Sequence, residues 1–168
     1  MEPRTIFQTD MALAYLAWGL CVARYVWPRL TGIDRVEALR AIATLHSFRF
    51  FGLVFLLPGF VGPELPGVFA APAAYGDLAT ALLAIGVLLT RRVHVWFLPL
   101  FWAFNVVGAT DLLMNIGRAI LVDLPSTAGQ LGAGYAIVIL YVPLLLITHG
   151  VAFYLLLRPA LAPARSAG

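Results

Sequence analysis

The chain has 168 residues, of which 62% are hydrophobic and 11% are charged, and its formal net charge is +3. Soluble domains carry about 25% charged residues and about half apolar ones, so this composition excludes a water-exposed globular fold. We expect an all-α membrane protein, with room for about five spanning helices of roughly 20 residues each.

All 11 basic residues are arginine. Their type and their distribution each exclude one class of function. Without lysine, lysine chemistry such as a Schiff base is not available. The arginines form no basic stripe interleaved with aromatic residues, so we expect no nucleic acid as a partner. The single cysteine, Cys21, has no second cysteine for an internal disulfide.

The sequence predicts one domain, residues 1–158, followed by a disordered cytoplasmic tail, residues 159–168. Its five expected spans are Met11 to Tyr25, Asp34 to Leu57, Asp77 to Thr90, Val93 to about Ile116, and about Leu131 to Leu157. Between them we expect a proline-rich loop at the membrane surface, residues 58–76, and a second connecting loop, residues 117–130.

Individual residues mark where these spans begin, end or bend. Pro28, Thr31 and Gly32 are expected to break the first span. Asp34 is followed three residues later by Glu37, which is the spacing of a capping box at the start of the second span. Pro143 is expected to kink the fifth span, because its nitrogen carries no hydrogen to donate.

The arginines predict the orientation of the chain in the membrane. Three connecting or terminal regions on one side hold Arg29, Arg35, Arg40, Arg91, Arg92, Arg158 and Arg165, whereas the opposite side holds Arg118. By the positive-inside rule, the N-terminus is outside and the C-terminus is cytoplasmic. The stretch Phe-Gly-Leu-Val-Phe-Leu-Leu-Pro-Gly at residues 51–59 resembles small bacterial multi-pass membrane proteins in general. It implies a bacterial inner membrane and no particular activity.

A histidine and an arginine lie one helical turn apart in the second span, at His46 and Arg49. At 1.5 Å per residue, they lie about 9 Å and about 13 Å from the cytoplasmic interface. His149 in the fifth span lies about 13 Å from that interface, and Asn105 lies near the middle of the fourth span. Polar residues in spans usually face the bundle interior, so we expect these four to share one buried pocket in the cytoplasmic half. Alternatively, each histidine bonds a backbone carbonyl and Arg49 extends to the headgroups.

A second polar group lies nearer the outer side. Asp111, Asn115 and Arg118 share one face of the fourth span, and Asp77 opens the third span on the same side. We expect Asp77 and Arg118 to be wet helix ends, and Asp111 to pair with Arg118 or a neighbouring helix. The alternative is an entry path, or a proton or ion site, on the outer face.

The leading functional hypothesis is a pocket that binds an amphipathic anionic small molecule, lipid or cofactor, with Arg49 holding the anion. Two imidazoles at matched depth are also the ligand set of a b-type haem, with His46 and His149 as the metal ligands. A third hypothesis is an accessory or structural subunit of a larger complex, in which Arg49 pairs with an acid of a partner.

The expected partners are membrane lipids and either another membrane subunit or further copies in a homo-oligomer. The motifs of serine hydrolases, P-loop proteins and dinucleotide-binding proteins are absent from the sequence. Acid–base chemistry on a lipid stays open, with His46 or His149 as the base, so the sequence does not decide whether the protein is an enzyme.

Overall fold

The computed structural model describes residues 1–90 and 95–158, and in these ranges the chain is helical without a β-strand. Five helical segments are long and apolar enough to cross a membrane: Pro3–Gly32, Arg35–Leu56, Gly67–Leu89, Phe97–Leu121 and Gly134–Leu157. The all-α prediction with five such helices is therefore confirmed. The predicted tail, residues 159–168, and the arginine pair at residues 91–92 lie outside the described residues.

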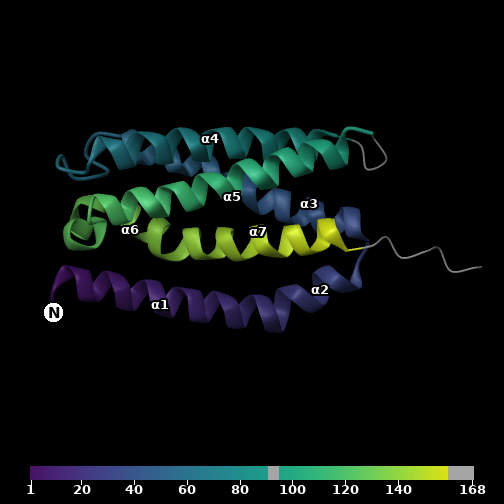
Figure 1. The fold of residues 1–168 in the computed structure, drawn as a ribbon, viewed down its shortest axis with the longest axis horizontal. Helices are drawn as coiled ribbons and strands as arrows, with labels where there is room; N and C mark the ends of the chain where they lie inside the picture. The colour runs from purple at the N-terminus through teal and green to yellow at the C-terminus, as the bar shows by residue number, and fades with distance from the viewer. Residues whose placement is uncertain (91–94, 159–168) are drawn as a thin grey trace, which may run out of the picture.

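The five segments run side by side along the long axis of the molecule (Figure 1). The helices are α1 (Pro3–Cys21), η1 (Val22–Val26), α2 (Trp27–Gly32), α3 (Arg35–His46), η2 (Ser47–Leu56), α4 (Gly67–Leu89), α5 (Phe97–Leu121), η3 (Leu124–Leu131), α6 (Gly134–Ala136), η4 (Ile137–Tyr141) and α7 (Val142–Leu157). We call the end of the bundle that holds the N-terminus the N-terminal end, and the end that holds the α2–α3 junction the opposite end.

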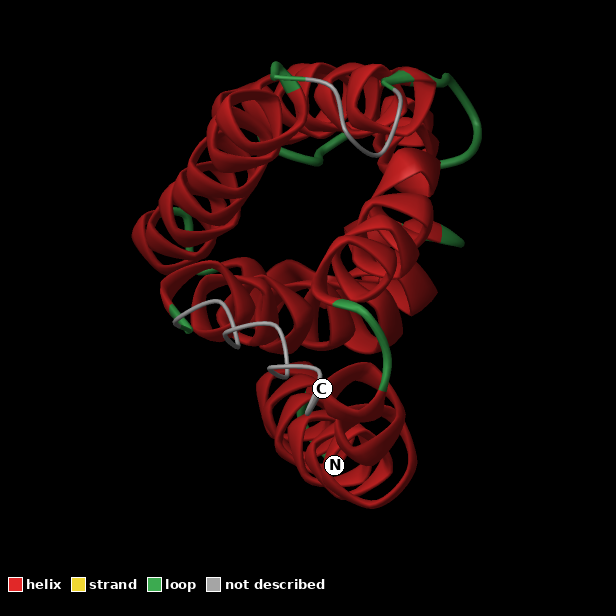
Figure 2. Cartoon of the chain, turned by 90° about the vertical axis from the view of Figure 1, so that its right-hand side faces the viewer, coloured by secondary structure: helices red, strands yellow, loops and turns green. Residues whose placement is uncertain are grey.

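Seen end-on, the last four segments form a ring, and the first segment lies outside it (Figure 2). This first helix packs against α7 and η3. Its indole at Trp18 donates to the carbonyl of Leu140 at 2.8 Å, and the hydroxyl of Tyr135 donates to Asp10 at 2.7 Å. The N-terminal helix is therefore fixed to the ring by polar contacts as well as by apolar packing.

Charged residues at the start of α3 organise the opposite end of the bundle. The carboxylate of Asp34 accepts hydrogen bonds from the backbone N–H groups of Val36 and Glu37, which confirms the predicted helix cap. Arg35 donates to two carbonyls at the end of α7, at 2.8 Å and 3.1 Å. Arg40 does the same at the end of α4, at 2.7 Å and 2.9 Å. Terminal carbonyls have no partner within their own helix, and a cation stabilises them.

Pro28 and Pro143 each lie inside a continuous helical segment and follow a π-helical turn. Pro28 is the second residue of α2 after η1, and Pro143 is the second residue of α7 after η4. The wider π turn absorbs the missing hydrogen bond and the clash of the proline ring with the preceding turn. Of the three residues predicted to break the first helix, Pro28 lies inside it, and the helix ends at Gly32.

The connection between the second and third spans is shorter than predicted. α4 begins at Gly67, ten residues before the expected start, and contains Pro72. Proline at this position deprives the carbonyl of Val68 of its helical partner, but Val68 lies near the helix end and is 67% exposed. The predicted loop at residues 58–76 is therefore wrong in its second half.

The loop predicted at residues 117–130 is also largely helical. α5 extends to Leu121, and the 3-10 helix η3 covers Leu124–Leu131. Arg118 lies in the last turn of α5, at a helix end as expected, but it is half-buried. Pro99 lies in the first turn of α5 and does not interrupt it, because N–H groups in a first turn have no intrahelical acceptor.

The second span changes from an α-helix to a 3-10 helix at Ser47, and the sequence did not predict this. η2 has 10 residues, whereas 3-10 helices longer than about four residues are uncommon. Three residues per turn align every third side chain on one face. Arg49, Gly52 and Phe55 form the buried face of η2, so the winding of this segment directs Arg49 into the bundle.

The interior has an apolar cluster toward each end and a polar layer between them. Toward the opposite end lie Leu39, Phe97, Phe101 and Phe104 with their neighbours. Toward the N-terminal end, a second cluster contains Phe7, Phe55, Phe69, Leu124 and Leu131. Among the described residues, the buried polar or charged ones are His46, Arg49, Thr80, Asn105, Thr148 and His149.

Candidate functional site

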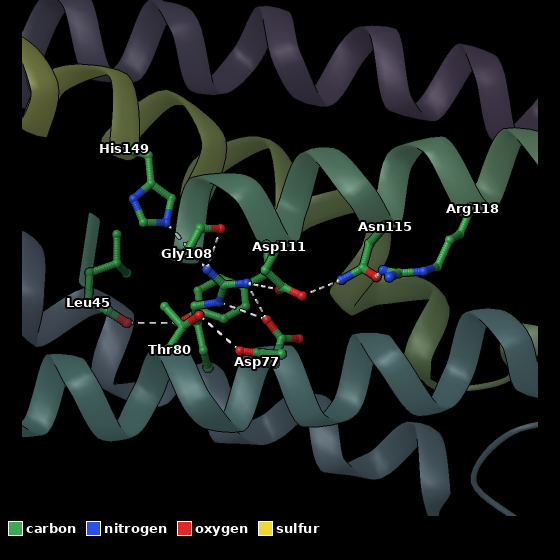
Figure 3. A network of polar contacts seen from close by, with 11 residues as sticks. Leu45, Asp77, Thr80, Gly108, Asp111, Asn115, Arg118 and His149 are labelled. Atoms are coloured by element: carbon green, nitrogen blue, oxygen red, sulfur yellow. Dashed lines mark hydrogen bonds and ion pairs between the residues drawn. The ribbon is translucent and has the colours of Figure 1, made fainter. Parts of the chain in front are cut away.

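The guanidinium of Arg49 is the centre of the polar layer, and each of its three nitrogens donates a hydrogen bond. Its partners Asp77, Gly108, Asp111 and His149 are labelled in Figure 3. Nε donates to Asp77 Oδ1 at 2.7 Å, and Nη2 lies 2.6 Å from Asp77 Oδ1 and 2.7 Å from Asp111 Oδ2. Nη1 donates to the carbonyl of Gly108 at 3.2 Å and to Nε2 of His149 at 3.3 Å. The Arg49 side chain has 0% exposure, so the protein replaces its water shell completely.

The two carboxylates come from different helices, Asp77 from α4 and Asp111 from α5, and both are largely buried at 15% and 10% exposure. Asp77 was expected at a wet helix end. It lies ten residues inside α4, because that helix begins at Gly67. Asp111 was expected to lie apart from Arg49, but the arginine side chain bridges that distance. The cluster of Arg49, Asp77 and Asp111 has one positive and two negative formal charges, which is a net charge of −1.

A chain of hydrogen bonds continues from Asp111 toward the N-terminal end. Asn115 donates to Asp111 at 3.1 Å and accepts from Arg118 at 2.8 Å, so the predicted shared face of α5 is confirmed (Figure 3). With Asn105, these residues extend the polar layer over 13 residues of α5, or about 20 Å along its axis. This is about two thirds of the hydrocarbon thickness of a bilayer.

His46 and His149 meet as predicted, with ring centroids 4.2 Å apart. Arginine can only donate, so Nε2 of His149 accepts from Arg49, and its Nδ1 donates to Asn105 Oδ1 at 2.7 Å. Nε2 of His46 lies 2.9 Å from the hydroxyl of Thr148, which itself donates to a backbone carbonyl, so this nitrogen carries the proton. Both imidazoles are thus neutral, in opposite tautomers.

The four residues predicted to share a pocket, His46, Arg49, Asn105 and His149, do lie together, and each is at most 1% exposed. Two of their polar atoms, Nδ1 of His46 and Nδ2 of Asn105, have no hydrogen-bond partner within residues 1–90 and 95–158. Arg49 does not extend to the headgroups. The predicted pocket contained no residue of the third span, whereas in the structure this helix, α4, contributes Asp77.

Three glycines make room for the side chains around Arg49. A Cβ atom on Gly52 would overlap the carboxylate of Asp77, and one on Gly76 would overlap that of Asp111. A Cβ atom on Gly108 would lie 2.7 Å from the ring of His149. These positions require glycine for close approach between neighbouring helices, not for an unusual backbone angle.

An apolar cavity of about 210 Å³ lies between this cluster and the N-terminal end. Phe7, Met11 and Tyr15 line it from one face of α1, and the ring helices supply the other walls. Asp77 and Asn115 bring the polar layer to its surface. The cavity therefore has an apolar body and a polar end, but it lies in the half of the bundle away from the predicted pocket.

The two histidines do not fit a haem between them. Imidazoles on both faces of a haem hold the iron at about 2.0 Å from each nitrogen, with the flat macrocycle between the rings. Here the rings contact each other at a centroid distance of 4.2 Å, and both nitrogens of His149 are already hydrogen-bonded. Among the described residues, no group of three or more His, Cys, Asp or Glu side chains is arranged to hold a metal ion.

One protein family matches almost the whole chain. The family described as "Domain of unknown function (DUF8737)" covers residues 6–157. The chain belongs to this family. No curated protein and no solved structure matches the chain. The matched region contains all five membrane-length segments from Ile6 onward and the complete Arg49 cluster, so the site described above lies within the family domain.

The glycine beside Asp77 gives a first prediction. Gly52→Ala should lower the free energy of unfolding in detergent by about 1–3 kcal/mol, because the new methyl group displaces the Asp77 carboxylate. Gly150→Ala is the matched control, since a Cβ atom there has no atom within 4 Å. It should be neutral or stabilise by up to about 1 kcal/mol. Equal stability of the two variants would contradict the close packing at Gly52.

The charge pairing of Arg49 gives a second prediction. Arg49→Leu should destabilise the fold by about 3–5 kcal/mol, because it leaves two buried carboxylates without a cation. Adding Asp77→Asn and Asp111→Asn to the same chain should recover most of this loss, since the uncompensated charges are then gone. Thermal unfolding of the single and triple variants measures the difference. A single variant as stable as the triple variant would show that the carboxylates do not depend on Arg49.

Proposed function

We propose that this protein binds an amphipathic small molecule or lipid within the membrane, with the apolar part in the cavity and the polar head at Asp77. The observation that carries this proposal is the cavity itself, which combines apolar walls with one carboxylate from the Arg49 cluster. Oδ1 of Asp77 accepts from Arg49. Oδ2 accepts no hydrogen bond from the described residues, so it is available to a donor on the ligand.

The size of the cavity sets the size of the group that it accepts. A protein cavity of about 150 Å³ holds benzene. In proportion, the 210 Å³ present here accept roughly eight or nine non-hydrogen atoms. A short alkyl chain or a small aromatic group fits these limits, whereas drug-sized ligands need about 300 Å³ or more.

The charge of the head group follows from the partners of Arg49. The sequence favoured an anionic ligand because a buried arginine was expected to hold it. Arg49 instead contacts two carboxylates, so its charge is already compensated within the chain. An anion beside Asp77 would meet a like charge in a poorly solvated site. A hydrogen-bond donor or a cation is the head group that suits this end of the cavity. The same pairing removes the reason to expect an acidic partner subunit for Arg49.

An open hollow on the surface supports entry of the ligand from the lipid. It has a volume of about 390 Å³ and lies between η2 and η4. Its walls are Leu45, Phe48, Phe51, Ala136, Ile137 and Tyr141. Ile137 lines both this hollow and the inner cavity, so the two spaces lie next to each other at this residue. An apolar ligand dissolved in the bilayer would reach the cavity by displacing the Ile137 side chain.

A series of ligands with one chain and three head groups tests the proposal. In nanodiscs, octylamine should bind most tightly and 1-octanol less tightly, and octanoate should bind at least about tenfold more weakly than octylamine, a difference of about 1.4 kcal/mol or more. Ala73→Leu, which fills the cavity, should remove the binding of all three ligands to the protein. It should not change the amount of ligand that dissolves in the nanodisc lipid, so the two can be distinguished. Asp77→Asn should remove the preference for the amine. Preferred binding of octanoate would overturn the assignment of the head group.

We further propose that the protein lies in a bacterial inner membrane, with its N-terminus outside and its C-terminus in the cytoplasm. The distribution of arginines supports this orientation. In a Cys21→Ala background, Glu64→Cys at the N-terminal end should react with a membrane-impermeant maleimide in intact cells. Ile33→Cys at the opposite end should react only after permeabilisation. The reverse pattern would invert the orientation.

A further inference from the structure

The cluster at the polar end of the cavity has an unbalanced charge. Arg49 is the cation that contacts both Asp77 and Asp111. The next cation along the hydrogen-bond chain, Arg118, contacts Asn115 and does not reach either carboxylate directly. A net charge of −1 in the interior of a membrane bundle is costly unless something neutralises it. One monovalent cation would complete the site.

We propose that a proton and the cationic head of the ligand compete for this single negative charge, so that the protein exchanges one for the other. This inference rests on the binding function proposed above. Without ligand, the two carboxylates share one proton and the cluster is neutral. When an ammonium head enters beside Asp77, that proton leaves as the ligand brings its own charge, so the net charge of the cluster stays at zero.

Each helix around the cluster contributes groups that make this exchange possible. Arg49 comes from η2, Asp77 from α4, Asp111 and Arg118 from α5, and His149 from α7. The remaining titratable neighbours are His46, which contacts His149, Tyr141 on η4, and Tyr15 across the cavity. The histidines donate or accept as neutral rings, and Arg49 stays charged. The carboxylate pair is therefore the part of the cluster that takes up or releases the proton.

The two carboxylates have different roles in the proposed site. Asp77 lines the cavity and has a free oxygen, so it meets the ligand directly. Asp111 does not line the cavity; it contacts Arg49 and accepts from Asn115. Because both acids lie against the same Nη2 group of Arg49, a change of charge at one is felt strongly at the other. Asp111 thus acts through Arg49 and Asp77, and its charge is the one that gives the cluster a net charge of −1.

The pH dependence of binding tests the exchange. The affinity for octylamine, which stays cationic between pH 5 and 9, should rise with pH by up to about tenfold per unit, because one proton is released for each ligand bound. The affinity for 1-octanol should not change with pH. In Asp111→Asn the cluster is already neutral, so the affinity for octylamine should lose its pH dependence. Glu64→Gln, which removes an acid at the N-terminal end, should retain it.

A second measurement keeps the test independent of these variants. Infrared difference spectra of the wild-type protein should show the carbonyl band of a protonated carboxyl group, and this band should disappear when octylamine is added. A pH-sensitive dye in weak buffer should record about one proton released per octylamine bound. If 1-octanol binds in the cavity but octylamine shows neither a pH slope nor proton release, the exchange is refuted and the binding function stands. If neither ligand binds, both proposals fail.

Discussion

A guanidinium buried in the middle of the helical bundle is the constraint on which this structure depends. Each of its N–H groups needs an acceptor, because no water is available to replace one. Arg49 obtains four acceptor atoms from three helices, with Asp77 Oδ1 contacting both Nε and Nη2, and no single helix provides enough of them. The requirement therefore brings α4, α5 and α7 close to η2, and it explains why glycine occurs at residues 52, 76 and 108, where larger side chains would keep the helices apart.

The sequence predicted the part of this site that depends on helix geometry alone. The fixed rise of an α-helix gave His46, His149 and Asn105 similar depths, and these residues are in contact. Asp77 was missed because Pro72 suggested a loop, so the third helix was started ten residues too late. Asp111 was placed too far from Arg49 because depths were assigned to Cα atoms. A long arginine side chain on a 3-10 helix, which rises about 2.0 Å per residue, reaches much further along the bundle.

The polar layer is closed on one side and open on the other. Toward the opposite end, His46 and His149 pack against Phe104, and Phe101 follows one turn later. Both phenylalanines have 0% exposure, so aromatic rings end the hydrogen-bonded chain there. Toward the N-terminal end, the layer reaches the cavity at Asp77 and continues to Arg118. The cavity in the N-terminal half is therefore the space that the polar layer reaches.

The first helix has a role that its sequence does not reveal. Most of α1 is exposed, as expected for a helix that faces lipid, yet Phe7, Met11 and Tyr15 recur every fourth residue and line the cavity. Without this helix, the apolar end of the cavity would be open to the surroundings of the bundle, and Asp77 would have no wall beside it. The carboxylate is tolerated because α1 encloses the space in front of it. The ring of four helices thus holds the charges, whereas α1 closes the space beside them into a cavity.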